Sequence, residues 1–220
     1  MSQSTRWLII GLLLLVLIGL LSQMGSIFAA TGTSLNVSAQ QISPSPTVLP
    51  ANYERRPIVR LGQLDPAQYL STNQFETWAY SACSASAMAV LINAYSAGRT
   101  YRVGDILQVE ASFRSPTVIT PEQGLLYPHG LDRTLAAFGF KTIWLNQPDI
   151  ATIVQLANAS QRVLVNFPLA LYPGGHFVVV TGGSANQVYT ADSSLYNNKV
   201  FSYAKFSQIW NGFALRIEPI

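Results

Sequence analysis

The stretch WAYSACSASAMAVLINAY, residues 78–95, holds the only cysteine of this 220-residue chain, Cys83, where a helical pattern of apolar residues begins. Gly98 marks the expected end of that helix. Because the N-terminus of a helix favours negative charge, it helps a thiol placed there to ionise. With Ser81 as the expected cap, the pattern predicts either a reactive Cys83 or a small, inert core residue.

On either side of this helix the chain divides into a helical half and a strand-rich half. Further helices are expected over residues 102–113, 130–140 and 149–160. Strands are expected over residues 162–167, 176–183, 187–192, 199–203 and 213–219, with a short helix over residues 207–212. Helices followed by an antiparallel sheet predict an α+β domain.

The N-terminal end has a different composition from the rest. Residues 1–30 carry one charge, Arg6, and an unbroken apolar run, which indicates a cleaved signal peptide or a retained membrane anchor. Residues 31–52 are rich in Ser, Thr, Gln and Pro and are expected to form a flexible linker. The domain is expected to span residues 53–220 and to lie outside the cytoplasm, secreted or held at the membrane by the N-terminal segment.

Composition and charge exclude several classes of protein. Hydrophobic residues make up 49% of the chain and charged residues 10%, which is typical of a globular core. The formal net charge of +3 is too small to indicate a nucleic-acid partner. One cysteine and two histidines that are 47 positions apart give no metal-ligand spacing, and no phosphate-binding loop is present. We therefore expect no metal, cofactor or nucleic acid.

A cysteine nucleophile requires an imidazole, and the chain has two histidines. His176 opens the expected strand HFVVVTGG directly after YPGG, where a glycine pair permits a sharp turn. His129 lies in a Pro/Gly loop and is expected to be structural. His176 is therefore the candidate general base and acid.

Asp192 ends the next expected strand and is the candidate that orients His176. In adjacent antiparallel strands, the start of one lies beside the end of the next, so both residues fall at one edge of the sheet. The alternative is that Asp192 only makes a turn, with Asn186 and Asn197 as weaker orienting candidates. Gln74, nine positions before Cys83, is the candidate oxyanion donor.

This order of residues resembles the papain-like cysteine peptidases, over about residues 55–218. The most similar branch holds the bacteriocin-leader (double-glycine) peptidases and their stand-alone, secreted relatives. The resemblance rests on these segments: SACSASAMAVLINAY, GDILQVEASF, GLDRTLAAFGF, GGHFVVVTGG and YTADSS. It implies a papain-like α+β fold with Cys83 as nucleophile, His176 as base and acid, Asp192 as orienting residue and Gln74 as oxyanion donor.

The chain departs from that family at two places. Ser84 and Ala85 stand where the family usually has Gly-Pro, and Gln74 is farther from the cysteine than is usual. The expected function is extracytoplasmic hydrolysis of peptide bonds in a peptide or protein substrate. The alternatives are a non-catalytic binding or scaffold domain of the same fold, and an amidase or acyltransferase of the cell envelope that uses the same site.

Overall fold

The computed structural model describes residues 55–96, 100–113, 119–125 and 127–220. The expected signal or anchor (residues 1–30) and the expected linker (residues 31–52) lie outside the described residues. Within the described ranges, no helix has the length and apolar character needed to cross a membrane.

The elements follow the order that the sequence predicts, helices first and most of the sheet afterwards. The helices are η1 (Pro66–Gln68), α2 (Thr72–Trp78), α3 (Cys83–Asn93), α4 (Val103–Glu110), α5 (His129–Ala137), α6 (Ile150–Asn158) and α7 (Tyr203–Ile209). The strands are β1 (Ile119–Thr120), β2 (Gly124–Leu125), β3 (Phe140–Trp144), β4 (Val163–Phe167), β5 (His176–Gly183), β6 (Gln187–Asp192), β7 (Val200–Ser202) and β8 (Ala214–Pro219).

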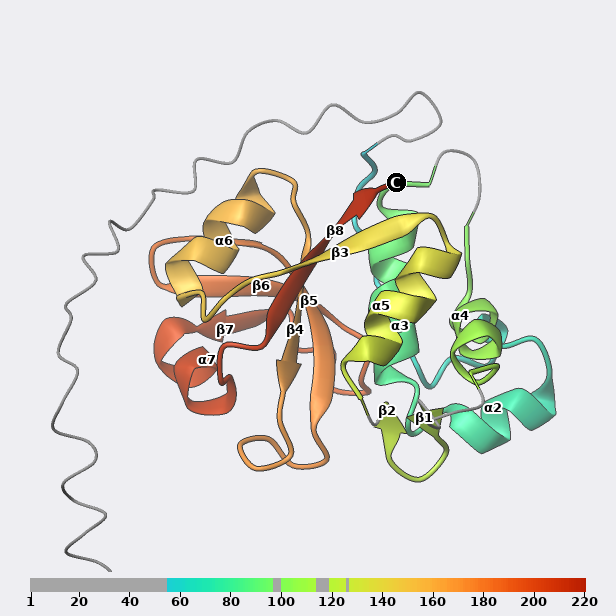
Figure 1. Cartoon of the computed structure of the whole chain (residues 1–220). Helices are drawn as coiled ribbons and strands as arrows, with labels where there is room; N and C mark the ends of the chain where they lie inside the picture. The colour runs from blue at the N-terminus through green and yellow to red at the C-terminus, as the bar shows by residue number, and fades with distance from the viewer. Residues whose placement is uncertain (1–54, 97–99, 114–118, 126) are drawn as a thin grey trace, which may run out of the picture. The chain divides into compact units, whose positions relative to one another are not determined.

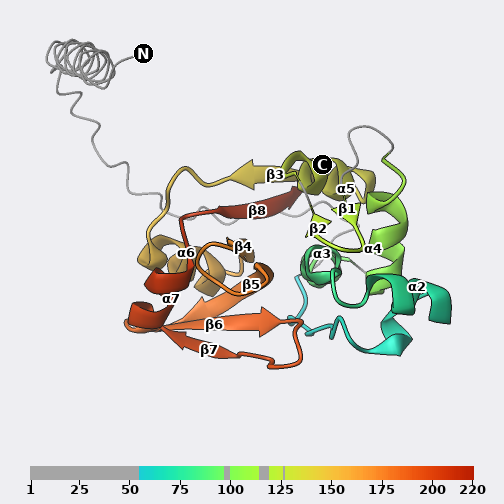
Figure 2. The ribbon, with the colours of Figure 1, turned by 90° about the horizontal axis from the view of Figure 1, so that it is seen from below.

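Six of these strands form one antiparallel sheet in the order β3-β8-β4-β5-β6-β7. Helices α2 to α5 gather on one side of it, and α6 and α7 lie on the other side (Figures 1 and 2). Strands β1 and β2 form a separate small hairpin. The predicted α+β fold class is confirmed.

Alternating residues of the central strands feed two apolar cores. Leu164 and Val179 face the core that contains α3, whereas Val163 and Val178 face the core that contains α6 and α7. This alternation follows from the two-residue period of a strand that is buried on both faces. Residues 84–92 of α3 are all buried, so α3 is the central helix of the domain.

Several elements differ from the sequence prediction, which did not include η1, α2 or the β1–β2 hairpin. Strand β3 was not predicted, and it pairs only with β8, at the edge of the sheet. The short helix expected over residues 207–212 is α7, which begins at Tyr203 because the Ser202 hydroxyl caps it by accepting from the Lys205 amide.

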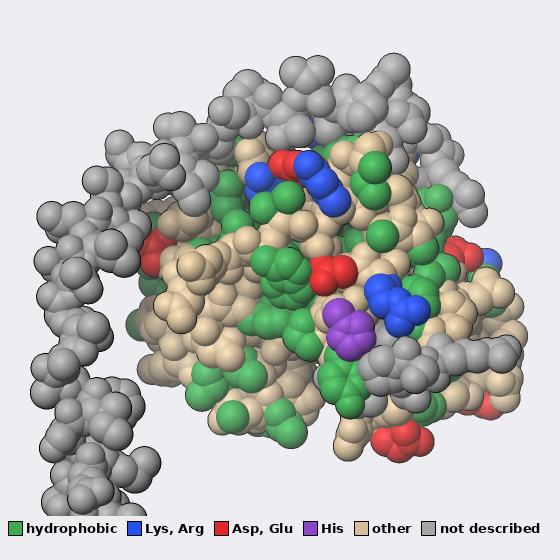
Figure 3. All heavy atoms as spheres, in the orientation of Figure 1, with side chains coloured by type: hydrophobic (Ala, Val, Ile, Leu, Met, Phe, Trp, Pro, Cys, Tyr) green, Lys and Arg blue, Asp and Glu red, His purple; other side chains and the backbone are tan. Residues whose placement is uncertain are grey.

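The face shown in Figure 3 carries charged side chains of both signs scattered among hydrophobic ones.

Candidate active site

Cys83 is the first residue of α3 and carries a free, partly exposed thiol. The residues that follow it on the helix are buried, so the thiol lies where a buried helix meets the surface. The predicted cap is wrong: the Ser81 hydroxyl donates to the Trp78 carbonyl, and the cap position is Ala82, which makes no side-chain bond. The first amides of α3 therefore have no side-chain acceptor and point toward the thiol end of the helix.

His176 and Asp192 lie side by side, as the strand pattern predicts. In the β5–β6 pair, Val178 is opposite Asp192, so His176 is two residues beyond that point, at the same edge. His176 Nε2 lies 2.7 Å from Asp192 Oδ1. The two glycines before His176 both have left-handed backbones, with φ of +83° at Gly174 and +63° at Gly175, which gives the sharp entry into β5.

Asp192 is 1% exposed and is surrounded by donors. Besides His176, it accepts hydrogen bonds from the backbone and hydroxyl of Ser194 and from the backbone and side-chain amide of Asn198, at 2.8–3.0 Å. Burial alone raises the pKa of Asp192, but the bonds from His176, Ser194 and Asn198 hold it well below its usual range. The carboxylate is therefore charged at neutral pH and fixes the ring of His176.

The His176 ring is hydrogen-bonded to Asp192 and lies near Cys83. Burial lowers its pKa, but the hydrogen bond to Asp192 and the proximity of Cys83 outweigh that effect and raise it to about 9. Because Asp192 occupies Nε2, Nδ1 is the ring nitrogen left for the thiol. The ring of Tyr172 stacks on the imidazole with 6.2 Å between ring centroids. His176 is thus held as an imidazolium beside a cysteine, the arrangement that a thiolate nucleophile needs.

Cys83 and His176 line one cleft of about 820 Å³. The β1–β2 hairpin and the loop from Pro168 to Gly175 form parts of its wall, and both lie at the lower end of Figure 1. Its other lining residues include Gln63, Tyr80, Ser81, Ser194 and Tyr196. Among the described residues, no cluster of three or more His, Cys, Asp or Glu side chains could hold a metal ion.

Gln74 does not lie in this cleft. Its side-chain oxygen accepts from the Leu70 amide at 2.8 Å and its nitrogen donates to the Gly104 carbonyl at 3.1 Å, so it joins α2 to α4. The prediction that Gln74 is an oxyanion donor is therefore corrected. Two glutamines line the cleft, Gln123 in the β1–β2 hairpin and Gln63, twenty positions before Cys83.

Gln63 is 8% exposed and rigidly held. Its Oε1 accepts from the Ser193 hydroxyl at 2.9 Å, and one Nε2 hydrogen goes to the Ala79 carbonyl at 3.1 Å. The amide nitrogen has a second hydrogen to donate. The sequence around Gln63 does not identify it as a cleft residue. The residues between Gln63 and Cys83 form η1 and α2, and Gln63 reaches the cleft only because this segment folds back.

The other candidates lie outside the site. His129 begins α5 and stacks on the ring of Tyr127, at 5.5 Å between centroids. Asn186 accepts from the Ser184 hydroxyl in the β5–β6 turn, at the opposite end of the strands from Asp192. Asn197 is close in sequence, but the amide that binds Asp192 belongs to its neighbour Asn198. Ser194 and Asn198 could have been predicted as hydrogen-bond donors to Asp192, because a turn rich in Ser and Asn follows this strand-ending Asp.

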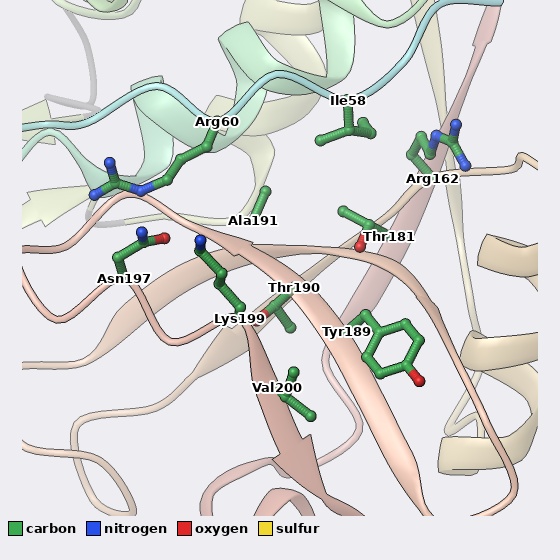
Figure 4. Close-up of a pocket in the computed structure, with 10 residues that line it drawn as sticks. All are labelled: Ile58, Arg60, Arg162, Thr181, Tyr189, Thr190, Ala191, Asn197, Lys199 and Val200. Atoms are coloured by element: carbon green, nitrogen blue, oxygen red, sulfur yellow. The ribbon is translucent and has the colours of Figure 1, made fainter.

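A second cavity of about 500 Å³ is lined by residues that precede and follow Asp192 in the sequence, among them Ala191 and Asn197 (Figure 4). Its lining includes Arg60, Asn197 and Lys199 and has no cysteine or histidine. The Arg60 guanidinium donates to the carbonyl oxygens of Asp192, Ser193 and Ser194. Arg60 therefore braces the backbone of the turn whose side chains hold the carboxylate.

Comparison with solved structures gives the class of this fold. The chain is similar to the peptidase domain of Streptococcus ComA, a bi-functional ABC transporter involved in a quorum-sensing pathway. The TM-score is 0.54 at 18% identity, and the match covers 74% of this chain and all of that domain. It is also similar to a putative C39-like peptidase from Bacillus anthracis, with a TM-score of 0.51 at 15% identity, covering 74% and 95% of the two chains. No protein-family model and no curated protein matches the sequence.

The domain therefore has a cysteine-peptidase-like fold, the papain-like fold of C39 peptidase domains, as the sequence motifs predicted. At these identities the likeness establishes the fold, and the chemistry rests on the residues of the cleft.

Proposed function

We propose that this chain is an extracytoplasmic cysteine peptidase that hydrolyses peptide bonds in a peptide or protein substrate. One observation carries the proposal: Cys83, at the start of α3, lies close enough to the His176 ring to raise its pKa, Nε2 of that ring is bound to Asp192, and Cys83 and His176 open into one cleft. The fold shared with peptidase domains supports the same chemistry.

In the proposed reaction, the Cys83 thiolate attacks the carbonyl carbon of the scissile bond. The backbone amide of Cys83 and the free Nε2 hydrogen of Gln63 stabilise the oxyanion that forms. The His176 imidazolium then gives its proton to the leaving amine, and an acyl-enzyme remains. His176 removes a proton from water, which attacks the acyl carbonyl, and breakage of the thioester releases the acid and returns the Cys83 thiolate beside the His176 imidazolium.

The proposed location rests on the apolar run in residues 1–30, which would export the chain or hold it at a membrane. A lone cysteine outside the cytoplasm has no partner for an intrachain disulfide, in agreement with a reactive role.

A non-catalytic domain of the same fold is the second candidate, and the Cys-Ser-Ala sequence favours it. Alkylation separates the two. At about pH 6.5 an ordinary thiol is about 1% thiolate, so we expect iodoacetamide to modify Cys83 in the folded full chain at least about tenfold faster than in the same chain unfolded in urea. Equal rates in the folded and unfolded chain would favour the non-catalytic domain.

Turnover is tested with a defined mixture of peptides and mass spectrometry of the products. We expect new peptide termini with the native chain and none with Cys83→Ala. Products joined to an added amine instead of water would identify an acyltransferase. Cleavage by folded Cys83→Ala would reject Cys83 as the nucleophile.

A further inference from the structure

Glu110, the last residue of α4, is a fully buried carboxyl group, and no ion pair between described residues includes it. The Ser84 hydroxyl donates to its Oε1 at 3.1 Å. Its other oxygen, Oε2, is buried, and no described residue donates a hydrogen bond to it. A buried carboxylate that lacks a counter-charge and is only half hydrogen-bonded is costly, whereas the neutral acid is tolerated.

The partner of Glu110 is the residue that follows Cys83. Ser84 is 0% exposed and belongs to the first turn of α3, so the Ser84–Glu110 bond joins that turn to the end of α4. The glycine that related peptidases usually have here has no hydroxyl to donate. The departure from the family motif is thus matched by a buried acceptor on another helix.

The surroundings of Glu110 favour its neutral form. Burial raises its pKa to about 8, and the hydrogen bond from Ser84 lowers it by less. Among the described residues, the titratable or charged groups on α4, at its N-cap and on the helices around it are Glu76, Cys83, Arg102, Asp105, His129, Asp132 and Arg133. None of them contributes to the shifted pKa of Glu110.

We propose that Glu110 is a protonated carboxylic acid that positions the nucleophile through Ser84, and that its ionisation sets an alkaline limit to the working range of the site. The positioning role rests on the proposed peptidase function. Glu110 acts through Ser84 and does not reach the substrate. A carboxylate in its place would draw water between α3 and α4 and would put a negative charge close to the Cys83 thiolate.

The charge state of Glu110 makes the stability of the fold depend on pH. The unfolded carboxyl ionises near its ordinary pKa of 4.5 and the folded one near 8. The contribution of neutral Glu110 to the free energy of unfolding is fully present below the unfolded pKa of 4.5. It is lost as the pH rises from there to the folded pKa of about 8. Glu110→Gln keeps the acceptor oxygen and cannot ionise. The gap in unfolding free energy between this variant and the native chain should widen between these two pH values and then stay constant.

Three measurements on the full chain test the proposal, with Glu76→Gln, an exposed acid on α2, as the matched control. Urea unfolding across this pH range should show the widening gap for Glu110→Gln and none for the control. Infrared difference spectra should show the carbonyl band of a protonated carboxyl at neutral pH, lost in Glu110→Gln and lost in the native chain above its pKa. At about pH 6.5, iodoacetamide should modify Cys83 in Glu110→Gln within about twofold of the native rate, and in Glu110→Ala about tenfold more slowly.

A parallel pH dependence of stability in the native chain and Glu110→Gln, or no protonated-carboxyl band, would overturn the proposal. Native alkylation in folded Glu110→Ala would overturn the positioning role. If Glu110→Ala does not fold, the curves and spectra of Glu110→Gln still decide the charge state. A native chain that alkylates like an ordinary thiol would reject the peptidase function, while the infrared band would separately report the protonation of Glu110.

Discussion

His176 and Asp192 are joined by a 2.7 Å bond between Nε2 and Oδ1 that links the first residue of β5 to the last residue of β6. The bond depends on strand register, because a slip of one residue would turn one of the two side chains to the other face of the sheet. Asp192 has four further hydrogen bonds that do not involve His176. The turn therefore holds the Asp192 carboxylate in position independently of His176.

Replacing Asp192 with Asn should separate the orientation of His176 from the fold. The amide removes the charge that helps to raise the pKa of His176, so less imidazolium remains at neutral pH. We expect iodoacetamide to modify Cys83 at least about tenfold more slowly at about pH 6.5. Circular dichroism provides the control for folding. An unchanged rate in a folded variant would show that Asp192 only shapes the turn.

The pH dependence of stability should report the His176 pair. Since the folded pKa is raised from 6.5 to about 9, the stabilisation by the imidazolium is fully present below 6.5 and is lost as the pH rises through 9. The gap in unfolding free energy between the native chain and His176→Gln should therefore shrink over that interval. His129→Gln, at an exposed position, is the matched control. A gap that does not change with pH would contradict the raised pKa.

Gln63 and Gln74 give opposite predictions. Gln63→Ala should lower peptide turnover by about 10² to 10³, the usual cost of an oxyanion donor, with little change in alkylation, which forms no oxyanion. Gln74→Ala should keep turnover and lose about 1 kcal/mol of stability with its hydrogen bonds. Assays of both variants with a substrate from the peptide mixture distinguish them. The reverse result would restore Gln74 as the donor and exclude Gln63.

Arg60 should affect the reactivity of Cys83 although it does not line the cleft that holds Cys83 and His176. Arg60→Ala removes the donors to three consecutive carbonyls of the Asp192 turn. We expect a lower melting temperature and alkylation of Cys83 slowed severalfold, since a looser turn holds the carboxylate less firmly. Lys199→Ala removes a cation from the same cavity and is the control. If both variants behave like the native chain, the turn does not need this brace.

The fold class could be predicted from the sequence, and so could the position of His176 and Asp192 at one edge of the sheet. Both predictions depend only on local sequence patterns. The β-branched runs gave β5 and β6, and antiparallel pairing then fixed which ends meet. Strand β3 was not predicted because its first residue, Phe140, was assigned to the helix before it, and its pairing with distant β8 leaves no local signal.

The sequence near Gln74 contains a local signal that argues against its predicted role as oxyanion donor. Ser71 caps α2 by accepting from the Gln74 amide, so Gln74 is the third residue of that helix. Ser followed three positions later by Gln is a helix-start signature, which favours a capping role for this glutamine. Gln63 could not be found in this way, because its place in the cleft depends on how the segment up to Cys83 folds back.

Cys83 is the chain's single sulfhydryl, and the helix that carries it is otherwise buried. Any thiol label that adds to the protein therefore adds at the proposed nucleophile, with no background sites to subtract. The mass gained per chain gives the fraction of molecules whose Cys83 is reduced and accessible, and the rate of that gain reports how reactive the site is. A thiol reagent can therefore be used to titrate the proposed active site before a substrate is known.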